Sequence, residues 1–167
     1  MNRFYILIFT AILAVALPGE IQAIEKVWTG LESSSWSSAN NWAPAGVPGS
    51  YDDVVFDGAI SNTNCNLGNT TIVGSLHLLP SFSGTVLGAN NANAILTIRT
   101  TGTIEGGTLD LRLSRLKSMQ LLHINGGSFI KGDGGICTLV NLQISSGSMS
   151  SQNARFQVLG NGFYLLT

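Results

Sequence analysis

The chain has 167 residues, a length that suits one domain. Charged residues make up only 10% of it, and the net charge of −1 excludes the basic footprint of a nucleic-acid binder or of a protein attached to an anionic membrane. Apolar residues make up 44%, enough to bury a core, which excludes a disordered chain. Ser, Thr, Asn and Gly supply the polarity instead of charged side chains, a balance typical of β-rich extracellular proteins.

Residues 1–23 have the features of a signal peptide. Arg3 supplies a positive charge, and the apolar run of residues 4–17 has the length of a signal core but is too short to cross a bilayer. Pro18 and Gly19 end this run, and we place the cleavage site after Ala23. An uncleaved N-terminal anchor is the alternative. No later apolar stretch approaches the ~20 residues of a membrane helix, so we expect a chain that is secreted or held at the cell surface, without a membrane span after cleavage.

Residues 24–57 hold all three tryptophans, Trp28, Trp36 and Trp42, and two of the four prolines. The prolines and glycines within residues 44–49 exclude a helix there. Residues 27–30 predict a short strand that ends in a turn, and residues 54–56 predict a short buried strand. We interpret the whole segment as an N-terminal cap that precedes the rest of the fold.

Short strands separated by turn signals follow the cap. Apolar–polar–apolar triplets begin at Leu76, Leu96, Leu122, Leu142 and Phe156, and the first four are spaced by 20, 26 and 20 residues. Most are followed by a glycine and another apolar residue at similar offsets. A degenerate repeat of about 20 residues predicts a solenoid, in which stacked coils bury the apolar ladders that one repeat cannot bury alone. We therefore expect an all-β solenoid over residues 58–167.

Several features of this part of the chain leave alternatives open. A β-sandwich also has short strands joined by turns. The 26-residue interval contains a further predicted strand at residues 109–113, and residues 114–122 are the one place where a short helix fits. Residues 162–167 end on apolar side chains without a polar cap. Because an uncapped coil is an open sheet edge, we expect the sequence either to be the front part of a longer protein or to dock on a partner, including end-to-end self-association through that coil.

The two cysteines, Cys65 and Cys137, each share a strand face with a leucine two residues further on. Both are therefore interpreted as small buried hydrophobic residues. Export permits a disulfide, but the repeat places the two thiols several coils apart, at about 4.8 Å per coil. Since a bridge needs Cα atoms within ~7 Å, free thiols are favoured over a disulfide.

The motifs W-T-G, W-S-S-A-N-N-W, G-V-P and D-D-V-V-F follow one another in the opening segment. This order resembles the N-terminal start of secreted bacterial β-helix proteins, including autotransporter-type passengers. The matching residues are Trp28, Gly30, Trp36, Asn41, Trp42, Gly46, Pro48, Asp53, Val55 and Phe56. The resemblance implies a right-handed parallel β-helix at the cell surface, used as a stalk, adhesin or matrix element. Members of that family are usually longer and carry a C-terminal barrel or sorting signal, which this sequence does not contain.

The tryptophans have two interpretations. Trp36 and Trp42 suit a carbohydrate contact, because an aromatic ring stacks on the apolar face of a sugar. Alternatively the three indoles close the exposed end of the apolar column, a role that suits their large buried area. We favour the second interpretation, and the residues expected to form this structural cap are Trp28, Trp36, Asn41, Trp42, Pro48, Asp53 and Phe56.

No metal site or cofactor is predicted. Asp52 and Asp53 have few other carboxylates near them for calcium, and we expect one of them to accept hydrogen bonds from turn amides after Gly49. His77 and His123 share an outward position of the repeat, in a column with Thr97, Gln143 and Gln157, where the Leu96 repeat separates the two imidazoles. The single Gly-Asp-Gly-Gly motif at residues 132–135 is expected to form a turn.

No catalytic residues are predicted either, since the acids are scattered along the chain and no G-x-S-x-G motif occurs. Asp110 and Arg112 are expected to pair or to be solvated. The leading hypothesis is a non-enzymatic, exported structural or adhesive solenoid. The alternatives are a polysaccharide-active lyase or hydrolase and a lectin-like sugar binder. The expected partners are extracellular glycans or other surface proteins, and no nucleic acid.

Overall fold

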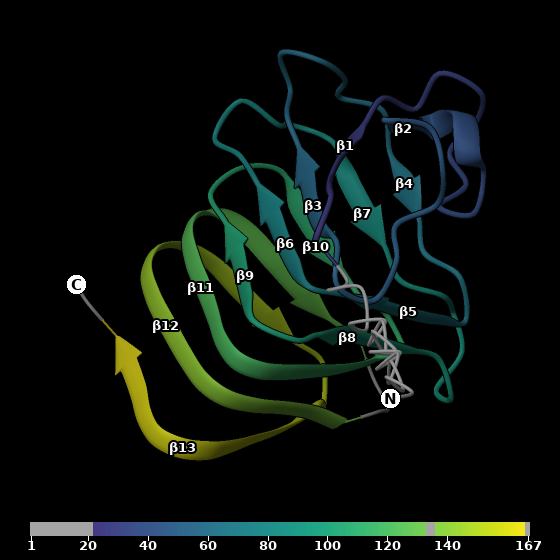
Figure 1. Cartoon of the computed structure of the whole chain (residues 1–167). Coiled ribbons are helices and arrows are strands. Elements are labelled where there is room, and N and C mark those ends of the chain that lie inside the picture. The colour runs from purple at the N-terminus through teal and green to yellow at the C-terminus, as the bar shows by residue number, and fades with distance from the viewer. Residues whose placement is uncertain (1–21, 133–135, 166–167) are drawn as a thin grey trace, which may run out of the picture.

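The computed structural model describes residues 22–132 and 136–165, and within them strands stack into a column of coils (Figure 1). The only helical element described is one 3-10 turn, η1 (Ala39–Asn41). The strands are β1 (Glu25–Trp28), β2 (Trp42–Ala43), β3 (Asp53–Phe56), β4 (Cys65–Asn66), β5 (Thr70–Val73), β6 (Ser75–Leu78), β7 (Thr85–Leu87), β8 (Ile95–Ile98), β9 (Thr101–Ile104), β10 (Thr108–Asp110), β11 (Arg115–Lys131), β12 (Ile136–Ser151) and β13 (Arg155–Leu165).

The strands form three parallel faces around one core. The first face runs β1, β3, β6, β9 and continues into residues 121–124 of β11 and 141–144 of β12. The second face runs β5, β8 and then the opening residues of β11, β12 and β13. The third face runs β4, β7, β10 and then residues 128–131 of β11 and 148–151 of β12. The predicted all-β solenoid, a parallel β-helix with a Trp-rich first coil, is therefore confirmed, and the β-sandwich is not what the chain forms.

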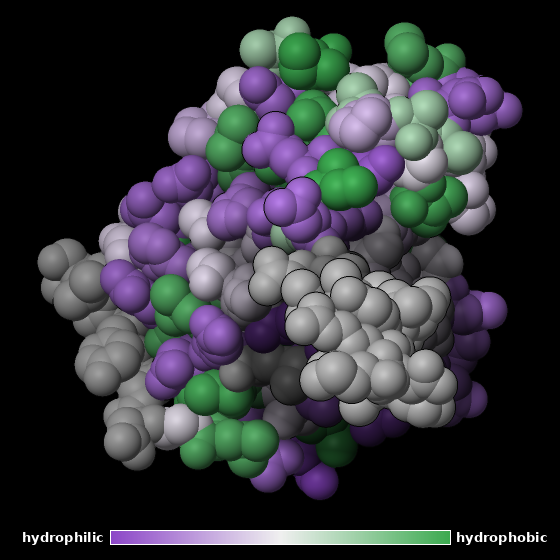
Figure 2. Space-filling view, in the orientation of Figure 1, coloured by the Kyte–Doolittle hydropathy of each residue, from purple (hydrophilic) through white to green (hydrophobic). Residues whose placement is uncertain are grey.

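Inward side chains of successive coils stack on one another. Val54, Leu76, Leu122 and Leu142 occupy one level of the first face and are at most 1% exposed. The alternation of buried and partly exposed residues along β3, β8 and β9 follows the period of two that a half-buried strand requires. Hydrophilic side chains cover much of the face turned to the viewer, with scattered hydrophobic ones between them (Figure 2).

The five predicted triplets do not all lie on the same face of the column, and the prediction was wrong for the triplets that begin at Leu96 and Phe156. Leu76 pairs in register with Gly102, and Gly102 with Leu122, on the first face. Leu96 instead pairs with Leu116 on the second face, which also holds Phe156. An apolar–polar–apolar triplet occurs wherever one strand face is buried, so the triplet alone does not identify the face to which a strand belongs.

Two smaller expectations also change. Residues 114–122, where a short helix fitted the sequence, mostly belong to strand β11. The strand predicted at residues 109–113 is present but shorter, since β10 ends at Asp110. It pairs with β7 and β11 as a regular strand of the third face, and is not an extra strand inserted into one coil. The coil that is 26 residues long runs from Leu76 to Gly102, and its extra residues lie in the loops between β6 and β7, at residues 79–84, and between β7 and β8, at residues 88–94. No helix in the described residues is long and apolar enough to cross a membrane.

The cysteines are free, as the sequence favoured, and both are 0% exposed. Cys65 lies in β4 on the third face, whereas Cys137 lies in β12 on the second face. Burial raises the pKa of the Cys65 thiol. Burial also raises the pKa of Cys137, to about 11, against a smaller opposing effect of the positive charge of Lys131.

Both thiols are expected to resist a disulfide reagent at neutral pH in the folded protein and to react at once after unfolding in urea. The thiolate is the reactive form, and burial disfavours it. Because these folded-state pKa values are raised, the stability they contribute is full below the ordinary value of 9.0 and falls as the pH rises towards 11. A colorimetric thiol titration of native and unfolded protein checks this, and fast labelling of the native state would contradict it.

Candidate functional site

The three tryptophans pack together at the first coil. Trp28, Trp36 and Trp42 are 0%, 4% and 2% exposed. The ring centroids lie 5.0 Å apart for Trp28 and Trp42 and 4.6 Å apart for Trp36 and Trp42, both in edge-on geometry. Phe56 of β3 joins them at 5.8 Å from Trp28, and Phe82 continues the stack at 5.2 Å from Phe56. The indoles thus fill the end of the column, and the rings of Trp36 and Trp42 offer no open face to a sugar.

Hydrogen bonds fix the orientation of these rings. The indole N–H of Trp28 donates to the Thr63 carbonyl oxygen at 3.0 Å, and that of Trp42 donates to the Trp36 carbonyl oxygen at 2.8 Å. Strand β2 runs antiparallel to β1 and pairs Trp42 with Trp28 on the side of β1 opposite β3. An exposed strand edge invites pairing with other chains, so β2 protects the first edge of the column.

Asn41 organises the loop around the tryptophans. It is 0% exposed, and its side-chain oxygen accepts hydrogen bonds from the amides of Glu32 and Ser33 at 2.8 and 3.0 Å. Its side-chain nitrogen donates to the Ser35 carbonyl oxygen at 2.9 Å. Pro48 is buried as well. With a further hydrogen bond from the side-chain nitrogen to the Ser33 hydroxyl at 3.1 Å, the Asn41 side chain makes four hydrogen bonds that support a loop with little regular structure.

The adjacent carboxylates of Asp52 and Asp53 accept hydrogen bonds from backbone amides and from a hydroxyl group. Asp52 accepts hydrogen bonds from the amides of Gly49 at 2.7 Å and Ile24 at 3.1 Å, which agrees with the predicted turn. Asp53 accepts one from the Ser75 hydroxyl at 2.6 Å. The described residues contain no group of three or more His, Cys, Asp or Glu side chains placed to hold a metal ion. The motif at residues 132–135 lies outside the described residues beyond Gly132.

The histidines lie on the outer side of the first face. His77 pairs in register with Thr103, which pairs with His123, which pairs with Gln143. The column predicted from the sequence is therefore correct for Gln143 and for the separation of the two imidazoles, but Thr97 lies on the second face, as does Gln157. Each imidazole has a hydroxyl neighbour: Ser75 at 3.0 Å from His77, and Ser145 at 2.9 Å from His123.

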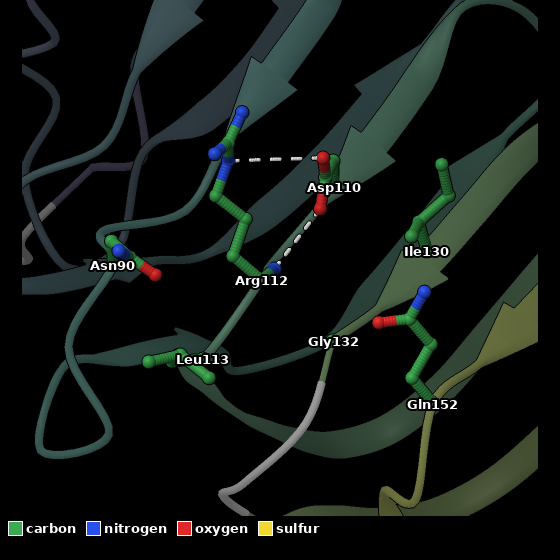
Figure 3. Close-up of a pocket in the computed structure, with 7 residues that line it drawn as sticks. All are labelled: Asn90, Asp110, Arg112, Leu113, Ile130, Gly132 and Gln152. Atoms are coloured by element: carbon green, nitrogen blue, oxygen red, sulfur yellow. Dashed lines mark hydrogen bonds and ion pairs between the residues drawn. The ribbon is translucent and has the colours of Figure 1, made fainter.

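A pocket of about 390 Å³ opens at the corner where the third face turns towards the second (Figure 3). It draws residues from the ends of four successive third-face strands: Asn90 after β7, Arg112 after β10, Gly132 after β11 and Gln152 after β12. We call it the corner pocket, and its lining residues are Asn90, Asp110, Arg112, Leu113, Ile130, Gly132 and Gln152.

An ion pair lies at the centre of the corner pocket. Arg112 Nε is 3.8 Å from an oxygen of Asp110, and the other Asp110 oxygen accepts the Arg112 backbone N–H at 3.0 Å (Figure 3). Of the two outcomes expected for these residues, pairing or solvation, the structure shows an ion pair whose arginine is half-exposed. Asp110 is the only carboxylate among the described residues that line this pocket.

The sequence analysis missed Asn90 and Gln152 and did not connect Arg112 with either. The 20-residue period contains the needed signal, since residues 112, 132 and 152 are spaced by one period each. Comparison with protein-family models, with curated proteins and with solved structures finds no match to this chain.

Proposed function

We propose that this chain is a non-enzymatic, exported β-solenoid that acts at the cell surface or in the extracellular matrix as a structural and adhesive module. The resemblance of the opening segment to secreted bacterial β-helix proteins points the same way. So does the signal-like composition of residues 1–23.

The observation that carries the proposal is the uninterrupted apolar column. Buried side chains run from Trp28 in the first coil through Leu78 and Phe129 to Cys137 and Leu142 in β12, in one hydrophobic cluster. Along each of the three faces, the stacked strands pair in parallel from one coil to the next. Such a column gives a stiff rod whose outer faces are free to vary, an arrangement that suits a stalk or a binding surface.

The test is export of the full chain from a bacterial host. Mature protein outside the cytoplasm is expected to begin at Ile24, as read by N-terminal sequencing, and added protease is expected to remove it from intact cells. A variant that lacks residues 1–23 serves as the control and is expected to stay in the cytoplasm. Full-length, uncleaved chain found only in the cytoplasm would overturn the proposal.

A further inference from the structure

We propose that the corner pocket binds the carboxylated sugar units of an acidic glycan. The inference deepens the proposed function, on which it rests, by naming the class of ligand that an adhesive module of this kind would hold. Sugar recognition is thereby assigned to a polar pocket on another part of the column, and not to the buried tryptophans of the cap.

The pocket is an elongated surface built by the stacking of coils. Arg112, Gly132 and Gln152 follow consecutively paired residues of the third face, since Asp110 pairs with Ile130 and Ile130 with Ser150. Asn90 comes from the coil before. Four coils at about 4.8 Å each give a site about 14 Å long from the first to the last. A site of this shape follows the column axis and suits a chain of sugars better than a single small ion.

Arg112 is the group that selects a carboxylate. Its side chain is 50% exposed, and among the described residues its guanidinium has one charged partner, Asp110, which faces Nε. Both terminal nitrogens point away from Asp110 in Figure 3. A guanidinium presents a planar pair of N–H groups that matches a carboxylate in a two-bond geometry.

A buried positive charge lies behind the same backbone. Lys131 is 0% exposed, and its ammonium donates hydrogen bonds to the Arg112 carbonyl oxygen at 2.8 Å and to the Gly132 carbonyl oxygen at 3.0 Å. These bonds hold two of the pocket's backbone segments together.

The remaining lining suits the rest of a sugar ring. Asp110 is 21% exposed and accepts hydrogen bonds, while the amides of Asn90 and Gln152 both donate and accept, as vicinal hydroxyl groups require. Leu113 and Ile130 are partly exposed and supply apolar surface for the C–H face of the ring. A few polar groups set around apolar surface are the usual composition of a small-molecule site.

The backbone at Arg112 supports a binding role. Its φ of 49° lies in the left-handed region, which side chains other than glycine rarely occupy. Glycine at this position would relieve the strain, so the arginine is retained against a local conformational cost. Residues held in such conformations concentrate at ligand sites.

The test is calorimetric titration of the purified protein, from whichever compartment it is recovered, with an oligomer of galacturonate and with the methyl ester of the same oligomer. The acid form is expected to bind at least tenfold more tightly than the ester, with weaker binding at higher salt. Arg112→Gln is expected to reduce affinity for the acid form at least tenfold. Arg115→Gln, which removes an exposed arginine on the second face, is expected to leave it unchanged.

A second variant separates binding from folding. Arg112→Gly is expected to lose the acidic oligomer while its urea midpoint stays equal to or above that of the unaltered protein, since glycine accepts the left-handed backbone. Equal binding of acid and ester, or an unchanged affinity in Arg112→Gln, would overturn the proposal. Export of the chain is measured without a glycan, so failure here leaves the proposed export intact and failure of export leaves this site intact.

Discussion

Replacing Trp28 with alanine is expected to lower the free energy of unfolding by about 3–5 kcal/mol, the usual cost of removing a large aromatic ring from a core. Trp28 is 0% exposed and contacts the rings of Trp42 and Phe56. Its indole N–H also donates a hydrogen bond to the Thr63 carbonyl oxygen. The substitution therefore leaves a cavity and a carbonyl oxygen without its partner, at the one place where the column's first end is closed.

In a solenoid each coil contacts only its neighbours, so the damage should be local. Hydrogen exchange of the Trp28→Ala variant is expected to speed up in β1 and β3 and to change little in β12. Urea unfolding measures the overall loss. Leu31→Ala, at a side chain that is 82% exposed, is the control, with an expected change within about 0.5 kcal/mol. An equal loss of protection in β12 would contradict the description of Trp28 as an end cap.

The parts of this fold that the sequence predicts are those with a strong local signal. Three indoles within one polar segment of low helix propensity have few ways to be buried except together, and Trp28, Trp36 and Trp42 are indeed in contact. Likewise, the period-two pattern identifies inward residues such as Leu122 and Ile124 without knowledge of their neighbours.

The phase of the coils is harder to predict, because every face uses the same apolar pattern. Leu76 and Leu96 look equivalent in sequence, yet the loops at residues 79–84 and 88–94 lengthen the coil between Leu76 and Gly102 and place the two leucines on different faces. Loops tolerate such insertions. The spacing of the triplets along the sequence therefore changes, while the strands still stack one coil on the next. The corner pocket was missed for this reason: its members align only once the coils are in the correct register.

The corners of the column depend on glycine for a physical reason. Gly107 lies between β9 and β10 with a φ of 55°, a left-handed backbone that costs other residues roughly 1–2 kcal/mol. A Cβ atom added there would lie 2.6 Å from the Gly84 carbonyl oxygen of the preceding coil and 2.6 Å from a ring carbon of Phe82. That oxygen is fixed, since it accepts the Thr108 amide at 3.0 Å.

Gly107→Ala is therefore expected to destabilise the fold by about 2–5 kcal/mol, from backbone strain together with overpacking of roughly 1–3 kcal/mol. The Ser128 amide donates to the Gly107 carbonyl oxygen at 2.9 Å, so a shift of this corner also disturbs the next coil. Gly68→Ala is a matched control, because nothing lies within 4 Å of its added Cβ atom. Its urea midpoint is expected to equal or exceed that of the unaltered protein. Equal midpoints for the two variants would mean that the coils do not approach each other this closely at the corner, because the strain at Gly107 follows directly from that approach.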